Sequence, residues 1–233
     1  MNVPLYLKKQ FTMLNIFRAY KKFFIVFFIV SAIILFLFYN ALKPQKTLPI
    51  FSPADVSPEL VDSLVEHITI NHRIEDWEFT NQNNILISQK DYEGKIYVAD
   101  FFFTTCPTIC PIMKDNMVWL QDEIQKYPDV MLLSHTVIPE IDTPEVLKAY
   151  ALEKGVDDSK WNLVTGDKKD IYYIARKSYL AVKTGNISEL YDMVHTENFI
   201  LVDKKRRIRG FYDGTDMNEM KRLLEDIKFL VKE

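Results

Sequence analysis

The sequence predicts an α/β domain, a central mixed sheet flanked by helices, carried behind one N-terminal transmembrane helix. Three observations support this prediction. The chain has 233 residues, 48% hydrophobic and 26% charged, which is enough apolar material for one folded core. An uncharged apolar run lies near the N-terminus, and after about residue 60 strand-like segments alternate with helix-like ones. With only 2 cysteines and 6 glycines, a disulfide-dense mini-protein and a collagen-like repeat are excluded.

The predicted membrane segment is residues 23–42, which begin with the uncharged run FFIVFFIVSAIILFLFY. A helix of this length spans about 30 Å, the hydrocarbon thickness of a bilayer. Residues 1–22 carry basic side chains and no acid, so the positive-inside rule predicts a cytoplasmic N-terminus and an extracytoplasmic domain. We interpret the segment as a single-pass signal anchor. A cleaved signal peptide is the alternative, but the run exceeds the usual apolar length of about 7–15 residues.

Residues 43–59 contain four prolines and no helical periodicity, which predicts a tether, and residues 60–233 then form the soluble domain. After residue 46 the chain carries 22 bases against 32 acids. An acidic domain of this kind argues against nucleic-acid binding, which requires a basic surface.

The first elements of the domain are a hairpin over 78–87, turned by the polar residues 81–84, and a buried strand over 96–103 (IYVADFFF). A loop with both cysteines follows, and then a helix. One face of that helix carries an apolar stripe: Met113, Met117, Leu120 and Ile124. We interpret the two methionines as core residues rather than metal ligands.

Residues 130–137 (VMLLSHTV) predict a second central strand. Thr143 is the expected N-cap of the next helix, with Pro144 at its first position and Gly155 at its end. A short strand over 161–164 comes next.

Asp167 is predicted to cap a helix that runs to about Tyr179. Strands over 199–202 and 208–212 then pair around a charged turn, and a helix over 216–232 ends the chain. We interpret the turn as solvated; the alternative is a docking patch for an acidic partner or anionic lipid. This order of elements is that of a thioredoxin-like sheet.

The chemistry centres on the segment TTCPTICP, which holds Cys106 and Cys110. The thiols lie just past a central strand and at a helix start, where active sites gather and where the helix dipole favours thiolates. Pro111 cannot sit inside a helix, so the helix begins no earlier than about Cys110. The spacing alone leaves three readings open: a structural disulfide, a metal site and thiol redox chemistry.

The four histidines differ in their sequence context. His67 and His72 lie in a polar region and are expected at the surface, whereas His135 lies in a strand and is expected as a hydrogen-bonded core residue. His195 precedes the terminal hairpin, and in a thioredoxin-like fold that loop packs against the cysteine loop. Two thiolates and one imidazole suit Cu(I), although a capping role for His195 is an equal alternative.

The segments FFFTTCPTICPIM, PEIDTPEVLKAYA and VHTENFILVDKKRRIRGFYDGT resemble the SCO/SenC family over about residues 75–230. Members of that family are membrane-anchored thioredoxin-fold proteins that help to deliver copper to cytochrome c oxidase. The resemblance implies a copper site, for Cu(I), Cu(II) or both, formed by Cys106, Cys110 and His195, with the cysteines joined in a disulfide when oxidised. It implies as partner the copper-bearing subunit of a haem–copper oxidase, with another copper chaperone or a thiol reductant as further partners. The expected location is the bacterial inner membrane.

The sequence departs from the family pattern at two positions. Ile138 stands where relatives commonly have Asp, and Phe102 where they often have Gly. The resemblance therefore carries no role of that Asp over to Ile138, and Phe102 is expected to narrow the space around the cysteine loop.

The main alternative function is a thioredoxin-type thiol–disulfide oxidoreductase that uses Cys106, Cys110 and, as proton acceptor, Asp100. Against it, the cysteines are separated by three residues instead of two, and no proline occurs in 145–233 to face them. A peroxidase and a purely structural role are weaker alternatives. We therefore expect a metallochaperone rather than an enzyme.

Overall fold

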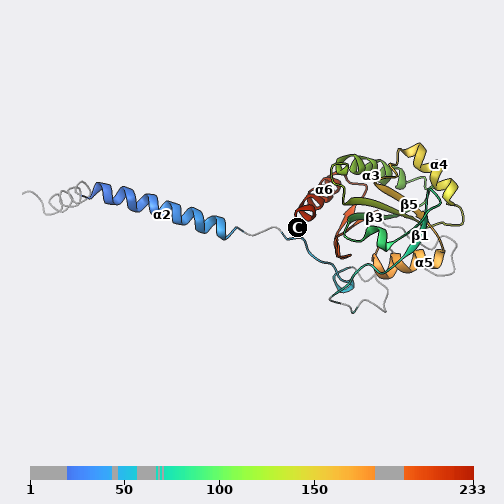
Figure 1. The fold of residues 1–233 in the computed structure, drawn as a ribbon, viewed down its shortest axis with the longest axis horizontal. Coiled ribbons are helices and arrows are strands. Elements are labelled where there is room, and N and C mark those ends of the chain that lie inside the picture. The colour runs from blue at the N-terminus through green and yellow to red at the C-terminus, as the bar shows by residue number, and fades with distance from the viewer. Residues whose placement is uncertain (1–19, 44–46, 57–66, 68, 70, 182–196) are drawn as a thin grey trace, which may run out of the picture. The chain divides into compact units, whose positions relative to one another are not determined.

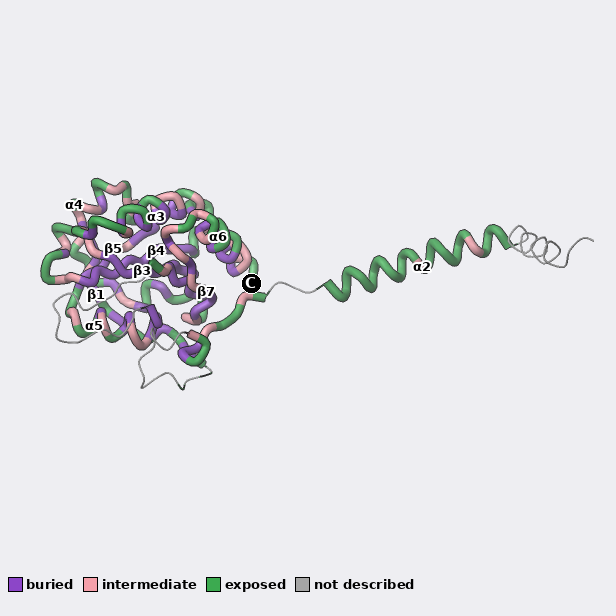
Figure 2. Tube along the Cα trace, turned by 180° about the vertical axis from the view of Figure 1, so that it is seen from behind, coloured by how far each residue is buried: buried purple, intermediate pink, exposed green. Residues whose placement is uncertain are grey.

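The computed structural model describes the following parts of the chain (Figure 1): residues 20–43, 47–56, 67, 69, 71–181 and 197–233. The chain divides into two compact units, residues 1–47 and 48–233. In the first unit, α2 (Lys21–Ala41) has no buried residue and is long and apolar enough to cross a membrane (Figure 2). The predicted N-terminal apolar helix is therefore present.

The second unit is built on a seven-stranded sheet of order β2-β1-β5-β4-β3-β6-β7. The three central strands β3, β4 and β5 run parallel, and the outer strands pair antiparallel. Helical connections after β3 and β4 explain the parallel centre, because a crossover returns the chain to the same edge of the sheet. The strands are β1 (Glu78–Asn81), β2 (Leu86–Ser88), β3 (Ile96–Phe102), β4 (Val130–Thr136), β5 (Trp161–Thr165), β6 (Asn198–Val202) and β7 (Ile208–Asp213).

Helices cover both faces of the sheet, α3, α4 and α6 on one side and α5 on the other (Figure 1). Even-numbered apolar residues of β3 pack under α3, and odd-numbered ones pack on the α5 side. All seven β3 residues are buried, as predicted for a strand covered on both faces. The helices are α3 (Cys110–Ile124), α4 (Pro144–Lys154), α5 (Lys168–Tyr173) and α6 (Met217–Lys232), with a π-helical turn (Ile174–Ser178) after α5 and short 3₁₀ turns at Pro53–Asp55 and Gln89–Tyr92.

The helix ends follow the predicted local signals. The Thr143 hydroxyl accepts a hydrogen bond from the first turn of α4, Pro144 is its first residue, and Gly155 ends it at φ 73°. Asp167 and Asp216 accept backbone N–H groups at the starts of α5 and α6. These side chains satisfy donors that the helix itself leaves unpaired.

The second unit begins at Leu48, earlier than the boundary near residue 60 that the sequence suggests. The buried Arg209 guanidinium donates to the carbonyls of Leu48 and Pro49, both at 3.0 Å, and Phe51 bridges to the edge strand β7. A buried guanidinium needs acceptors, and part of the proline-rich segment supplies them.

The histidine expectations are corrected at two positions. His67 is exposed as predicted, but His72 is buried and its Nε2 lies 2.7 Å from the carbonyl oxygen of Ser178. His135 lies in the core as predicted, stacked on Phe101. Within the described residues, however, neither of its ring nitrogens has a hydrogen-bond partner of ordinary geometry, and burial lowers its pKa to about 3. His135 is therefore neutral near pH 7.

The turn between β6 and β7 is solvated at its tip, where Lys204 and Lys205 are exposed. Behind the tip, Arg207 and Arg209 pair with the buried Asp203 carboxylate at 2.6 and 2.9 Å. The predicted charged turn is confirmed, and it is stabilised through Asp203 by Arg207 in the turn and by Arg209 in β7.

We expect Gly155→Ala to lower the free energy of unfolding by about 1–2 kcal/mol, because an L-residue is strained in the left-handed region. A Cβ added there would meet no atom within 4 Å, so the loss of stability comes from the backbone conformation and not from a steric clash. Urea unfolding of the full chain tests this, with Gly155→Asn as control. Equal losses for Ala and Asn would contradict it, since Asn tolerates this conformation better.

Candidate functional site

The cysteine loop leaves the C-terminal end of β3, in the middle of the sheet. The Val137 N–H donates to the Phe102 carbonyl at 2.8 Å, which closes the β3–β4 ladder at that end. After Phe103 the chain turns, with the Cys106 N–H 3.3 Å from the Phe103 carbonyl, and α3 begins at Cys110. The helix thus starts where Pro111 predicted, because proline is favoured in the first helical turn.

The two thiols are free, close together and mostly buried, with 7% of Cys106 and 3% of Cys110 exposed. Burial alone would raise the pKa of Cys106, but hydrogen bonds from Cys110 and Thr108 outweigh it, and that pKa lies below its ordinary value. Burial and the neighbouring Cys106 thiol raise the pKa of Cys110. Cys106 is therefore the group that more readily forms the thiolate.

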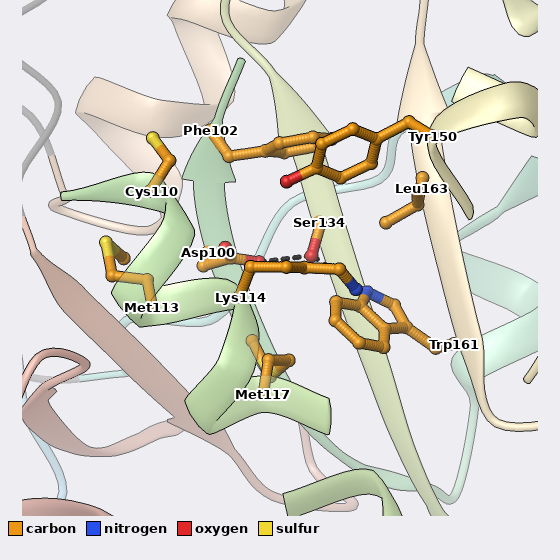
Figure 3. A pocket seen from close by; sticks show the side chains of 10 residues that line it. All are labelled: Asp100, Phe102, Cys110, Met113, Lys114, Met117, Ser134, Tyr150, Trp161 and Leu163. Atoms are coloured by element: carbon orange, nitrogen blue, oxygen red, sulfur yellow. Dashed lines mark hydrogen bonds between the residues drawn. The ribbon is translucent and has the colours of Figure 1, made fainter. Parts of the chain in front are cut away.

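A pocket lies behind Cys110, between α3 and the sheet (Figure 3). Cys110 lies at one end of the pocket and Trp161 at the other, and Asp100 lies between them. The Ser134 hydroxyl donates to Asp100 and accepts the Trp161 indole N–H at 2.8 Å. Burial raises the pKa of Asp100 to about 6, against the opposing effects of Ser134 and Lys114.

Lys114 is a second buried charge in this pocket, and sequence reasoning did not assign it a role. Its Nζ lies 3.4 Å from the centre of the Trp161 ring, and within the described residues it has no hydrogen-bond partner. Burial lowers its pKa to about 7, while the Asp100 carboxylate acts in the opposite direction. The spacing in the sequence could have identified it, because Lys114 lies four residues after Cys110 and is therefore on the same face of the helix.

The structure places the other predicted site residues as follows. Asp100 lies in the same pocket as Cys110, and Met113 and Met117 are buried in the core as predicted. Phe102 lines the pocket and packs against Tyr150, with ring centres 5.7 Å apart. Ile138 packs against the core on the opposite face of the sheet, the face that α5 covers. His195 lies outside the described residues. Within the part of the chain that is described, no group of three His, Cys, Asp or Glu side chains is arranged to hold a metal ion.

A free dithiol at a helix start, directly after the central strand of a mixed sheet, defines a dithiol protein of the thioredoxin-like class. Comparison with known proteins identifies the family: the SCO1/SenC family model matches residues 66–232, and the chain belongs to that family.

The relatives agree with this assignment. A SCO1 protein homologue of Bacillus subtilis is 30% identical over 161 residues, which are 68% of this chain and 83% of that protein. A SCO1/SenC family lipoprotein from Bacillus anthracis, of known structure, is 34% identical with a TM-score of 0.62 and covers 69% of this chain and 96% of its own.

Two further solved structures are similar to this chain. BsSco, in which a disulfide switch was identified, is 30% identical with a TM-score of 0.60, over 70% of this chain and 95% of its own. Bradyrhizobium japonicum ScoI, solved with copper bound, is 23% identical with a TM-score of 0.55, over 69% of this chain and 99% of its own, and it shares the fold. These structures confirm the predicted thioredoxin-like fold.

The raised pKa of Asp100 predicts an unusual dependence of stability on pH. Because folding moves this pKa from 3.8 to about 6, the folded chain binds more protons than the unfolded chain between these values. The free energy of unfolding must therefore fall as the pH rises through this window. Asp100→Asn lacks this titration, so its free energy of unfolding does not show this fall. Between about pH 4 and about pH 7, the stability of the variant relative to the parent should therefore increase by on the order of 1–3 kcal/mol.

Urea unfolding of the reduced, metal-free chain at several pH values tests this, with Asp203→Asn as the matched control. Hydrogen bonds from Arg207 and Arg209 outweigh burial and lower the pKa of Asp203, so its carboxylate stabilises the fold above the unfolded pKa and loses this effect in acid. The two variants should therefore change the slope in opposite directions, Asp100→Asn between about pH 4 and about pH 6 and Asp203→Asn below about pH 4. A change of the same sign in both would refute the assignment of Asp100.

Proposed function

We propose that this chain is a membrane-anchored copper-delivery protein for the assembly of a cytochrome c oxidase, and that Cys106, Cys110 and His195 bind the copper. The observation that carries the proposal is the pair of free, adjacent thiols at the end of β3, in a chain of the SCO1/SenC family. Thiolate sulfur is a soft ligand and favours Cu(I), so the donor set fits this cargo.

Relatives support the copper and the oxidase parts of the proposal. BsSco is described as a member of the Sco family of cytochrome c oxidase assembly proteins, and Bradyrhizobium japonicum ScoI binds copper in its solved structure. By analogy, the partner of this chain is the copper-bearing subunit of a haem–copper oxidase. Another copper chaperone or a thiol reductant would load or reduce the site.

The unequal thiols give the site an order of events. Cys106, with the lower pKa, is the first to offer a thiolate, and Cys110 gives up its proton only when a cation replaces it. Release then proceeds by ligand exchange with thiolate or imidazole groups of the partner. Because thiols and imidazole bind protons in acid, affinity for copper should fall as the pH decreases.

The membrane helix fits a protein that works beside a membrane-bound oxidase. We propose that α2 anchors the chain in a bacterial inner membrane, with residues 1–22 in the cytoplasm and the domain on the extracytoplasmic side. The basic residues that precede the helix carry this orientation.

A thiol–disulfide oxidoreductase is the second candidate, and the pocket behind Cys110 favours it specifically. Asp100 is buried there beside Cys110 with a pKa of about 6, which suits a group that accepts a thiol proton. The two activities are compatible, because the cysteines must be reduced before they can bind copper.

Copper titration of the reduced full chain in detergent, with a competing chelator, tests the first candidate. We expect one copper ion per chain, no tight binding by Cys106→Ser or Cys110→Ser, and at least about tenfold weaker binding by His195→Ala, a loss of about 1.4 kcal/mol. His67→Ala, at an exposed histidine, is the matched control and should bind like the parent.

Either of two results would change the proposal. Parent-like binding by His195→Ala would remove His195 from the ligand set. A parent that binds no copper but reduces a model disulfide in a Cys106-dependent reaction would favour the oxidoreductase.

A further inference from the structure

A buried carboxylate from a different element holds the backbone just before the cysteines. Asp142 lies between β4 and α4 and is 1% exposed. Its Oδ2 accepts the Thr104 N–H at 3.2 Å, and its Oδ1 accepts the Thr104 hydroxyl. Oδ2 also accepts the hydroxyl of Thr136, the last residue of β4. One side chain therefore joins the cysteine loop to the neighbouring central strand.

The connection that carries Asp142 is itself tightly turned. The N–H groups of Ile141 and Asp142 donate to the Ile138 carbonyl at 3.0 and 2.9 Å, and the Ile138 N–H donates to the Thr136 hydroxyl at 3.1 Å. These bonds hold the backbone that carries Asp142, and the buried side chain is held in turn by Thr104 and Thr136. It is a fixed support rather than an adaptable surface group.

Thr104 is the point at which this support reaches the thiols. It lies two residues before Cys106, inside the turn closed by the Cys106 N–H and the Phe103 carbonyl. This segment has left the β-ladder, so its polar groups need partners from elsewhere. A carboxylate suits the position because it only accepts, and all three groups that meet it donate.

We propose that Asp142 is a positioning residue for the Cys106–Cys110 pair. By fixing Thr104, it restricts the turn that presents Cys106 and keeps the two sulfurs in the arrangement that closes a disulfide or binds one metal ion. The copper part of this inference rests on the proposed function, whereas the disulfide part is independent of it.

The disulfide equilibrium of the metal-free full chain, in detergent, tests the inference. In a glutathione buffer, glutathione disulfide oxidises the dithiol: the S–S bond of glutathione disulfide breaks, an S–S bond forms between Cys106 and Cys110, and the two thiol protons end on the two molecules of glutathione released. A restricted loop raises the effective concentration of one thiol toward the other. We expect Asp142→Ala to lower the equilibrium constant about three- to tenfold, the effect of losing one or two hydrogen bonds of ordinary net strength.

Two more variants separate positioning from general destabilisation. Thr104→Val removes only the hydroxyl and should shift the constant in the same direction by a smaller factor, and the double variant should be no worse than Asp142→Ala alone. Asp203→Ala is the matched control, because Asp203 is also a buried carboxylate that accepts several hydrogen bonds, but beyond the opposite end of β3. It should lower the melting temperature and leave the thiol equilibrium unchanged.

The outcomes are distinct. Unchanged constants in both Asp142→Ala and Thr104→Val, or an equal shift in Asp203→Ala, would overturn the inference. The predicted shift together with weaker copper binding by Asp142→Ala would support it in full. The predicted shift in a chain whose parent binds no copper would support the role of Asp142 and overturn the proposed function.

Discussion

Burial of β3 on both faces determines where the chemistry of this domain can take place. The strand lies between β4 and β6 and under helices on each side, so its backbone N–H and C=O groups are paired with those two strands. The chain can only become irregular beyond Phe102, at the C-terminal end of the strand. The cysteine loop lies at this end, and α3 returns over the strand immediately afterwards. Cys110 is consequently placed over the core and Cys106 in the loop, and their opposite pKa shifts follow from these two surroundings.

Three of the buried charged side chains, Asp100, Lys114 and Asp142, lie toward this end of the sheet. Asp100 accepts a side-chain hydrogen bond from Ser134 and lies in the pocket with Lys114, whereas Asp142 is met by three donors. Lys114 balances Asp100 but is held mainly by the face of the Trp161 ring. Buried charges rarely increase stability relative to apolar residues of similar size. The position of Asp100 and Lys114 beside Cys110 therefore points to the reactivity of the thiols rather than to the stability of the fold.

The sequence predicted those features that depend on neighbours along the chain. Proline at position 111 set the start of α3, Thr143 and Asp167 marked helix caps, and the apolar run before the cysteines identified the central strand. Features that depend on distant partners were missed. His72 was expected at the surface because its partner, the Ser178 carbonyl, is 106 residues away. Asp142 reads locally as the residue before a helix cap, and only the fold brings Thr104 to it, 38 residues earlier in the chain.

The attachment of residues 48–56 has a mechanical consequence. These residues are held by Arg209 and by the Phe51 bridge to Ile208, near the N-terminal end of β3. A force that pulls on residues 48–56 is resisted first by these few bonds. It would have to separate this segment from β7 before it could strain the central strands. The cysteine loop lies at the other end of β3, so the attachment of residues 48–56 and the thiols are separated by the length of the central strand.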